Sequence, residues 1–119
     1  MGRIGVSEFV DEVPKIDWKF KIPSAFYLFG HRYEVQWSDD LCDKEEVVGK
    51  SVYREQRVEI QRNNVVVTRK PSQIENTFFH ELIHCIFWEL RENELRPNEK
   101  LVQQIAALLH QALTTAEYD

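Results

Sequence analysis

The stretch FFHELIHCIFWEL, residues 78–90, places two histidines and a glutamate within a strongly apolar segment. Its apolar residues recur every three or four positions, as they do along one side of an α-helix. They are Phe79, Leu82, Ile83, Ile86 and Leu90. Upstream, Ser72 and Glu75 have the spacing of a capping box. The pattern therefore predicts a helix that begins just after Pro71 and ends near Arg91.

A second helix is expected after the polar linker ENELR, residues 92–96. Pro97 suits the first turn of a helix, where a missing backbone N–H costs no hydrogen bond. The apolar residues that follow it have helical spacing, and they are Leu101, Val102, Ile105, Ala106, Leu109 and Leu113. The C-terminal part of the chain is therefore predicted to be two helices.

The segment before these helices has the pattern of β-strands. Aromatic and β-branched residues flank Gly30 in IPSAFYLFGHRYEVQW, residues 22–37, which predicts a hairpin with strands near 25–29 and 31–37. The charged stretch at residues 38–50 is expected to be a loop, with at most a short turn of helix.

Two further strands are expected before the first helix. SVYREQRVEIQR, residues 51–62, contains Val58 and Ile60 in alternation with polar residues, as in a half-buried strand. A turn at Asn63-Asn64 and a strand in VVVT, residues 65–68, would follow.

Strands first and two helices last predict an α+β fold, a small and mostly antiparallel sheet with the helices on one face. Residues 1–21 are mixed and polar and are expected to be a weakly ordered lead-in. Residues 22–119 are expected to be a single domain, because 119 residues are too few for two sizeable cores.

Composition excludes several classes of protein. Fifteen Lys and Arg against twenty Asp and Glu give a net charge of −5, which argues against a nucleic-acid partner and a DNA-binding regulator. Two cysteines exclude a disulfide framework and fit a reducing cytoplasm. No apolar run approaches the roughly 18 residues of a membrane span. A cytoplasmic protein without membrane contact is expected.

The pattern HELIH places His80 and His84 four residues apart, so both imidazoles can point from one helix toward one ion. This H-E-x-x-H spacing is that of zinc sites in which two histidines bind the metal and the intervening glutamate is a general base. Glu81 is the expected base. The alternative is that the histidines have structural roles only, but burying two imidazoles and a carboxylate among phenylalanines is costly unless they are paired.

A catalytic zinc site needs a third protein ligand, and several carboxylates are available. Glu89 lies off the histidine face, and Glu92 and Glu94 fall in the polar linker. Glu99 heads a stripe of the second helix that otherwise looks buried. Glu99 is the expected ligand, and the alternative is that it only interacts favourably with the helix dipole. Zinc fits a set of two histidines and one glutamate better than manganese or iron.

These patterns resemble a family. HELIH on one helix and NEKLVQQIAALL on the next are similar to small phage and prophage metallopeptidases of the gluzincin kind, related to the ImmA/IrrE-type peptidases. The resemblance covers roughly residues 22–113 and implies a zincin-like domain. It also implies that a glutamate on the second helix, here Glu99, is the third zinc ligand. The chain departs from the family in having no Gly inside the HExxH pattern and in its short spacing from His84 to Glu99, and no fused partner domain is expected.

The expected function is therefore zinc-dependent hydrolysis of peptide bonds, with a protein or peptide, such as a regulator, as substrate. The strand RVEIQ, residues 57–61, could form an exposed edge that pairs with an extended substrate. Tyr53, His31 and His110 are candidates to stabilise the oxyanion, with ordinary packing as the alternative for each. The alternative function is a catalytically silent metal-binding or protein-interaction module of phage origin. Glu81 argues against it, since a structural zinc site has no use for that carboxylate.

Overall fold

The computed structural model describes residues 17–119. In chain order the elements are β1 (Ala25–Leu28), β2 (His31–Trp37), α2 (Leu41–Glu45), β3 (Gly49–Val52), a 3₁₀ turn (Tyr53–Glu55), β4 (Arg57–Ile60), α3 (Pro71–Glu89) and α4 (Glu99–Thr115). A four-stranded mixed sheet precedes the two C-terminal helices, which confirms the predicted α+β class. Of the lead-in predicted at residues 1–21, residues 1–16 lie outside the described residues.

The predicted hairpin around Gly30 is present. β1 and β2 are antiparallel, and Leu28 pairs with His31, so only two residues form the turn. Both turn residues have a positive φ, 50° at Phe29 and 79° at Gly30. A turn of this kind matches the twist of the strands, and glycine adopts it without steric cost.

The sheet has the strand order β1-β2-β4-β3 and is mixed, where the sequence predicted a mostly antiparallel sheet. β4 is antiparallel to β3 but parallel to β2, with Val35 opposite Val58. The chain passes through α2 and β3 before β4 returns beside β2, and a parallel pair requires such a crossover. β4 is therefore an inner strand and β3 an edge strand.

Two strand predictions are wrong. The segment 51–62 is not one strand, because the 3₁₀ turn and a left-handed Gln56 separate β3 from β4. The segment 65–68 is not a strand either. There the Asn64 side chain accepts hydrogen bonds from the backbone N–H groups of Val66 and Val67, at 2.9 and 2.7 Å. Local bonds of this kind compete with strand pairing.

Helix α3 begins at Pro71 as predicted, but with a different cap. The Gln73 side chain accepts a hydrogen bond from the Lys70 backbone N–H at 2.8 Å, so the cap lies two residues before Ser72. Helix α4 begins after Asn98, whose side chain accepts from Leu101 N–H at 3.1 Å. Asn98 is a favourable N-cap residue. Pro97, which was predicted to lie in the first turn, therefore precedes the helix.

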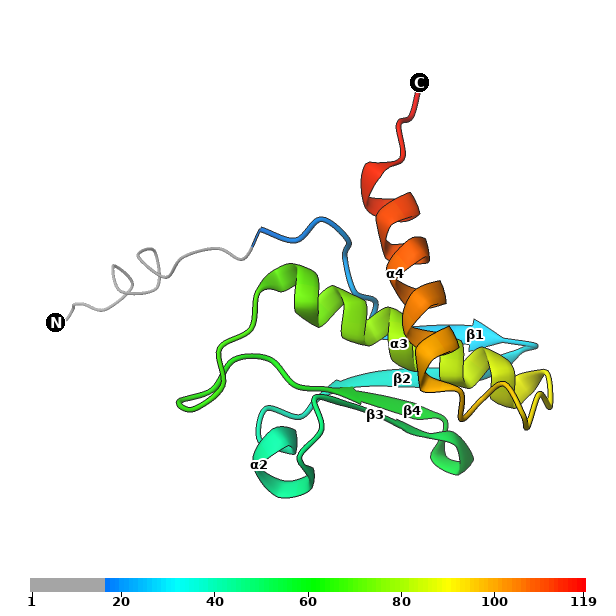
Figure 1. Cartoon of the computed structure of the whole chain (residues 1–119), viewed down its shortest axis with the longest axis horizontal. Coiled ribbons are helices and arrows are strands. Elements are labelled where there is room, and N and C mark those ends of the chain that lie inside the picture. The colour runs from blue at the N-terminus through cyan, green and yellow to red at the C-terminus, as the bar shows by residue number, and fades with distance from the viewer. Residues whose placement is uncertain (1–16) are drawn as a thin grey trace, which may run out of the picture.

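The core lies between the sheet and α3, and α4 packs on the opposite side of α3 (Figure 1). Its buried apolar side chains come from the strands, α3 and α4: Tyr33, Val58, Ile60, Ile74, Phe78, Phe79, Ile83, Cys85, Phe87, Val102 and Ala106. The C-terminal half of α4 extends beyond α3 (Figure 1), and the predicted core residue Leu113 is 42% exposed. α3 is therefore the central element, in contact with both layers.

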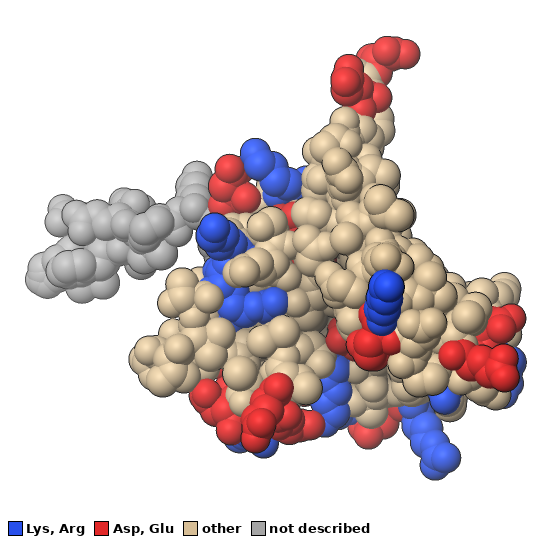
Figure 2. Space-filling model, viewed as in Figure 1, with Lys and Arg blue, Asp and Glu red and all other residues tan. Residues whose placement is uncertain are grey.

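Acidic and basic side chains both lie on the surface, and some of them form ion pairs, such as Lys44 with Asp40. Figure 2 shows acidic side chains gathered over α2, where Asp40, Asp43, Glu45 and Glu46 are exposed. Lys and Arg side chains lie elsewhere on this face, including near the beginning of α3 (Figure 2). The face in view therefore carries side chains of both signs. Among residues 17–119, neither α3 nor α4 combines the length and apolar character required to cross a bilayer.

A buried carboxylate joins the N-terminal segment to both helices. Glu75, predicted as a cap residue, is instead fully buried. It accepts hydrogen bonds from the backbone N–H groups of Lys19 and Phe20, at 2.9 and 3.3 Å, and from His110 Nε2 at 2.7 Å. Phe20 also packs against Phe79 with ring centroids 4.7 Å apart. The end of the predicted lead-in is thus attached to the core.

We expect Glu75→Ala to lower the free energy of unfolding by about 3–5 kcal/mol, because it leaves buried donors without an acceptor. Urea denaturation followed by circular dichroism measures this change. Glu94→Ala, in the exposed linker, is the control and should change the value by no more than about 0.5 kcal/mol. A similar small change for Glu75→Ala would show that this carboxylate does not hold the three segments together.

Candidate metal centre

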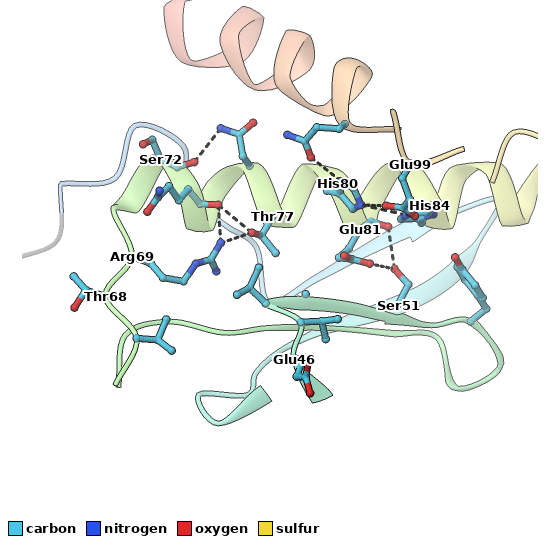
Figure 3. Close-up of a pocket in the computed structure, with 18 residues that line it drawn as sticks. Glu46, Ser51, Thr68, Arg69, Ser72, Thr77, His80, Glu81, His84 and Glu99 are labelled. Atoms are coloured by element: carbon cyan, nitrogen blue, oxygen red, sulfur yellow. Dashed lines mark hydrogen bonds and ion pairs between the residues drawn. The ribbon is translucent and has the colours of Figure 1, made fainter. Parts of the chain in front are cut away.

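His80, His84 and Glu99 converge where α3 meets the beginning of α4 (Figure 3). The Nε2 atoms of the two histidines are 3.2 Å apart. One oxygen of Glu99 lies 2.9 Å from His80 Nε2, and the other lies 2.9 Å from His84 Nε2. Two imidazoles four residues apart on one helix thus face a carboxylate from the next helix, as the sequence analysis expected.

The position of protons at this cluster follows from its neighbours. His80 Nδ1 lies 2.9 Å from the amide oxygen of Gln103, which can only accept a hydrogen bond. A proton on His80 Nδ1 satisfies this contact, and in the neutral imidazole it leaves the lone pair of Nε2 facing Glu99. His84 Nδ1 is buried and has no hydrogen-bond partner within residues 17–119.

This arrangement favours a cation. The Nε2 atoms of both histidines and the carboxylate of Glu99 point toward one space, and with neutral imidazoles such groups repel one another unless positive charge lies between them. A proton on His84 Nε2 would satisfy part of these contacts, whereas a metal ion would satisfy all of them. Two imidazole nitrogens and one carboxylate are the ligand set of catalytic zinc sites that keep a position open. The residues present therefore fit a zinc ion.

The site is open to solvent on one side. The side chain of Glu99 is 66% exposed, against 19% for His80 and 10% for His84. A closed structural zinc site would have four enclosed protein ligands. The exposure of Glu99 is instead what an accessible metal site requires.

Glu81 lies beside the cluster but on the side of α3 that faces the sheet. It is 7% exposed, and its Oε1 accepts a hydrogen bond from the Ser51 hydroxyl at 2.7 Å. Burial raises the pKa of this carboxyl, although Ser51, His80 and His84 act in the opposite direction. A carboxyl with a raised pKa, adjacent to a metal cluster, is suited to accept a proton.

Gly49 allows β3 to approach α3 at this point. A Cβ atom at position 49 would lie 2.5 Å from Thr77 Cγ2 and 2.9 Å from Glu81 Oε2. Neither distance is possible unless the strand or the side chains of Thr77 and Glu81 shift. A glycine in a strand commonly marks such a close approach.

A cleft of about 1100 Å³ contains the cluster and Glu81. It extends along α3 to the segment that precedes this helix, with β3 as one wall (Figure 3). Residues 57–61 were predicted to form the edge beside the site, but β4 is an inner strand. β3 is the edge strand that lines the cleft, and its outer side pairs with no strand among the described residues.

The other carboxylates considered as ligands lie elsewhere. Glu89 accepts hydrogen bonds from the hydroxyl of Tyr33 and from His31 Nδ1, the latter at 2.9 Å. Burial opposes ionisation of Glu89, but these two bonds outweigh it and lower its pKa. Glu92 and Glu94 are exposed in the linker.

Among the three oxyanion candidates only Tyr53 lines the cleft. His31 is paired with Glu89, and His110 with Glu75. The Tyr53 ring stacks on Trp88 with centroids 4.8 Å apart. Burial, first among the causes, raises the pKa of Tyr53 to about 12, so its hydroxyl remains protonated at neutral pH.

Three residues at the site were missed by the sequence analysis. Gln103 could have been found, because it lies one turn after Glu99 on the same side of α4. Ser51 and Gly49 had no such signal, since their roles arise only when β3 packs against α3.

Gln103→Leu is expected to weaken zinc binding by roughly 10- to 100-fold, the usual effect of losing a partner that orients a ligating histidine. The reason is that His80 loses the acceptor at Nδ1 that holds its ring and tautomer. Competition with a zinc-responsive chelating dye measures the affinity. Gln104→Leu, on the exposed side of α4, is the control. Equal affinities for the two variants would contradict the assigned role of Gln103.

Comparison of the chain with models of protein families, with curated proteins and with solved structures finds no match. The function of the site therefore has to be inferred from the geometry and chemistry of its own residues.

Proposed function

We propose that this protein is a zinc-dependent metallopeptidase. His80, His84 and Glu99 hold the zinc ion, and Glu81 is the general base. The observation that carries the proposal is the convergence of His80, His84 and Glu99 beside a buried carboxylate in an open cleft. Metal ligation alone would not require Glu81, which is not part of the cluster.

A bound zinc ion would act as a Lewis acid, which polarises a peptide carbonyl and lowers the pKa of a water molecule. Glu81 Oε1 is held by Ser51, so Oε2 is the oxygen left to take a proton. The proton would come from the water molecule, whose oxygen bonds to the carbonyl carbon, and Glu81 would return it to the amine nitrogen as the C–N bond breaks. Ser51 fixes the carboxylate, and Gly49 lets β3 approach it closely.

The substrate is a peptide segment in extended conformation. β3 is an edge strand along the cleft, and an edge strand offers unpaired backbone groups to an added strand. Pairing of this kind fixes the peptide in register with the reacting groups, while side chains enter the cleft at every second position. This favours an unfolded or loop segment as the target.

Tyr53 is suited to donate a hydrogen bond to the oxygen that becomes negative during hydrolysis. We expect Tyr53→Phe to lower kcat by about 100-fold, as loss of one such donor does, with KM little changed. Steady-state kinetics separates the two parameters, and zinc content verifies that the centre is intact. An unchanged kcat would assign Tyr53 to packing against Trp88 only.

The test of the proposed function is hydrolysis of an unfolded protein, such as reduced casein, by the purified chain. Cleavage is expected when zinc is present. It should stop when 1,10-phenanthroline removes the metal and return when zinc is restored. The same assay with manganese or iron in place of zinc shows whether cleavage requires zinc or only a divalent metal. Absence of cleavage by fully zinc-loaded protein on casein and on peptide libraries would leave a metal-binding module without peptidase activity.

A further inference from the structure

Arg69 is a cation inside the cleft, away from the metal cluster. Its Nη1 donates to the carbonyl oxygen of Gln61 at 2.6 Å. Its Nη2 donates to the carbonyl oxygen of Gln73 at 3.1 Å and to the Thr77 hydroxyl at 2.5 Å. A guanidinium has five N–H groups, so two of them remain without a partner among the described residues. All three acceptors are neutral.

The charge of Arg69 is not compensated by a carboxylate. Arg57 Nε lies 2.8 Å from Glu59, and Arg62 Nη2 lies 2.8 Å from Asp39. Within residues 17–119 no ion pair involves Arg69, although its side chain is partly buried. Burial lowers the pKa of Arg69, which shows that its charge is disfavoured where it lies. An unpaired charge that is partly removed from water is stabilised when an anion binds to it.

Arg69 lies a short distance along the cleft from the groups proposed to react. Its contact Thr77 precedes Glu81 by four residues, about 6 Å along α3. Both residues line the same cleft, and Figure 3 shows Arg69 reaching toward Thr77 at one end with the metal cluster at the other. An extended peptide advances about 3.3 Å per residue, so this separation corresponds to about two residues.

We propose that Arg69 binds a carboxylate of the peptide substrate, about two residues from the bond that is cleaved. This inference rests on the proposed peptidase function and gives it a substrate class, which is acidic peptides. The carboxylate is that of an Asp or Glu side chain, or that of a free C-terminus, since both present the same two oxygens to a guanidinium.

The test uses N-acetylated and C-amidated decapeptides of Ala, Ser and Val that differ at one position, which holds Glu, Gln or Lys. The wild type is expected to cleave the Glu peptide about two residues from the Glu, with kcat/KM at least about 10-fold above that of the Gln peptide. Mass spectrometry of the products locates the cleaved bond. A Gln peptide with a free C-terminus in place of the amide distinguishes a terminal carboxylate from a side-chain carboxylate.

Arg69→Gln is expected to abolish the preference for Glu, and Arg69→Lys to keep part of it, because the charge remains while the planar fork is lost. Arg62→Gln is the matched control, since Arg62 is paired with Asp39 and does not line the cleft. Thermal unfolding verifies that each variant is folded. If Arg69→Gln does not fold, two results still show whether Arg69 binds the carboxylate. They are the Glu preference of Arg69→Lys and the ratio of kcat/KM for the Glu and Gln peptides in the wild type.

Binding of the same peptides to Glu81→Gln protein, measured by isothermal titration calorimetry, is the second readout. A Glu preference in binding that depends on Arg69, without hydrolysis by the wild type, would refute the peptidase function and support the carboxylate site. Hydrolysis with equal rates for Glu and Gln peptides would refute the carboxylate site and support the peptidase. Absence of both binding and hydrolysis would refute both.

Discussion

Glu81→Gln is expected to lower the rate of peptide hydrolysis by up to about 10⁴-fold while zinc content stays at the wild-type level. Loss of a general base typically reduces a rate by 10²- to 10⁴-fold. The amide retains the shape of the carboxylate and can still accept the hydrogen bond from Ser51, but it cannot take up a proton. The measurement is kcat/KM on the peptide that the wild type cleaves best, together with zinc content by elemental analysis.

The zinc content is what makes Glu81→Gln informative. Glu81 is not one of the clustered ligand atoms, so its loss should affect chemistry without releasing the metal. Glu92→Gln, in the exposed linker, is the matched control and should retain full activity. Full activity of Glu81→Gln would exclude a proton-transfer role. Loss of zinc in the same variant would instead assign Glu81 to the metal shell.

Glu99→Ala and His84→Ala are each expected to reduce a zinc content near one ion per chain to a small fraction of that value. Loss of a direct ligand should cost more than the roughly 10- to 100-fold that loss of an orienting partner costs. The melting temperature of the wild type should also rise with added zinc, because a metal that binds only the folded state stabilises it. This rise should disappear in both variants.

The result for Glu99 distinguishes its two possible roles. If Glu99 only interacted with the dipole of α4, its removal would cost a few tenths of a kcal/mol and leave zinc content unchanged. Glu94→Ala is a control of the same residue type at an exposed position in the linker. Unchanged zinc in Glu99→Ala, with loss in His84→Ala, would require another third ligand.

Local periodicity was sufficient to predict the two helices that carry the metal cluster and also the first hairpin. α3 and α4 have apolar residues at helical spacing, and the hairpin of β1 and β2 has a glycine at its turn. In each, contacts between residues near in sequence determine the pattern. The four-residue spacing also predicted that His80 and His84 lie on one side of a helix, and their Nε2 atoms are 3.2 Å apart.

Pairing between distant segments could not be predicted in the same way. β4 has the alternation of a half-buried strand, but alternation does not specify its neighbours. Its parallel pairing with β2 makes β3 the edge of the sheet, which moves the proposed peptide-binding strand from residues 57–61 to Gly49–Val52. Likewise, Glu75 looked like a cap residue and is instead a buried acceptor, because the N-terminal segment and α4 bring donors to it.

The sequence by itself determined the α+β class, the two C-terminal helices, and the placement of His80, Glu81 and His84 on one helix. The sequence also predicted that Glu99 meets the histidines. Only the tertiary structure decided that Gln103 contacts His80, that Ser51 holds Glu81, and that Arg69 enters the cleft. The physical reason is that helical spacing is a property of neighbouring residues. Contacts between α3, α4 and β3 depend instead on how apolar faces far apart in the chain pack together.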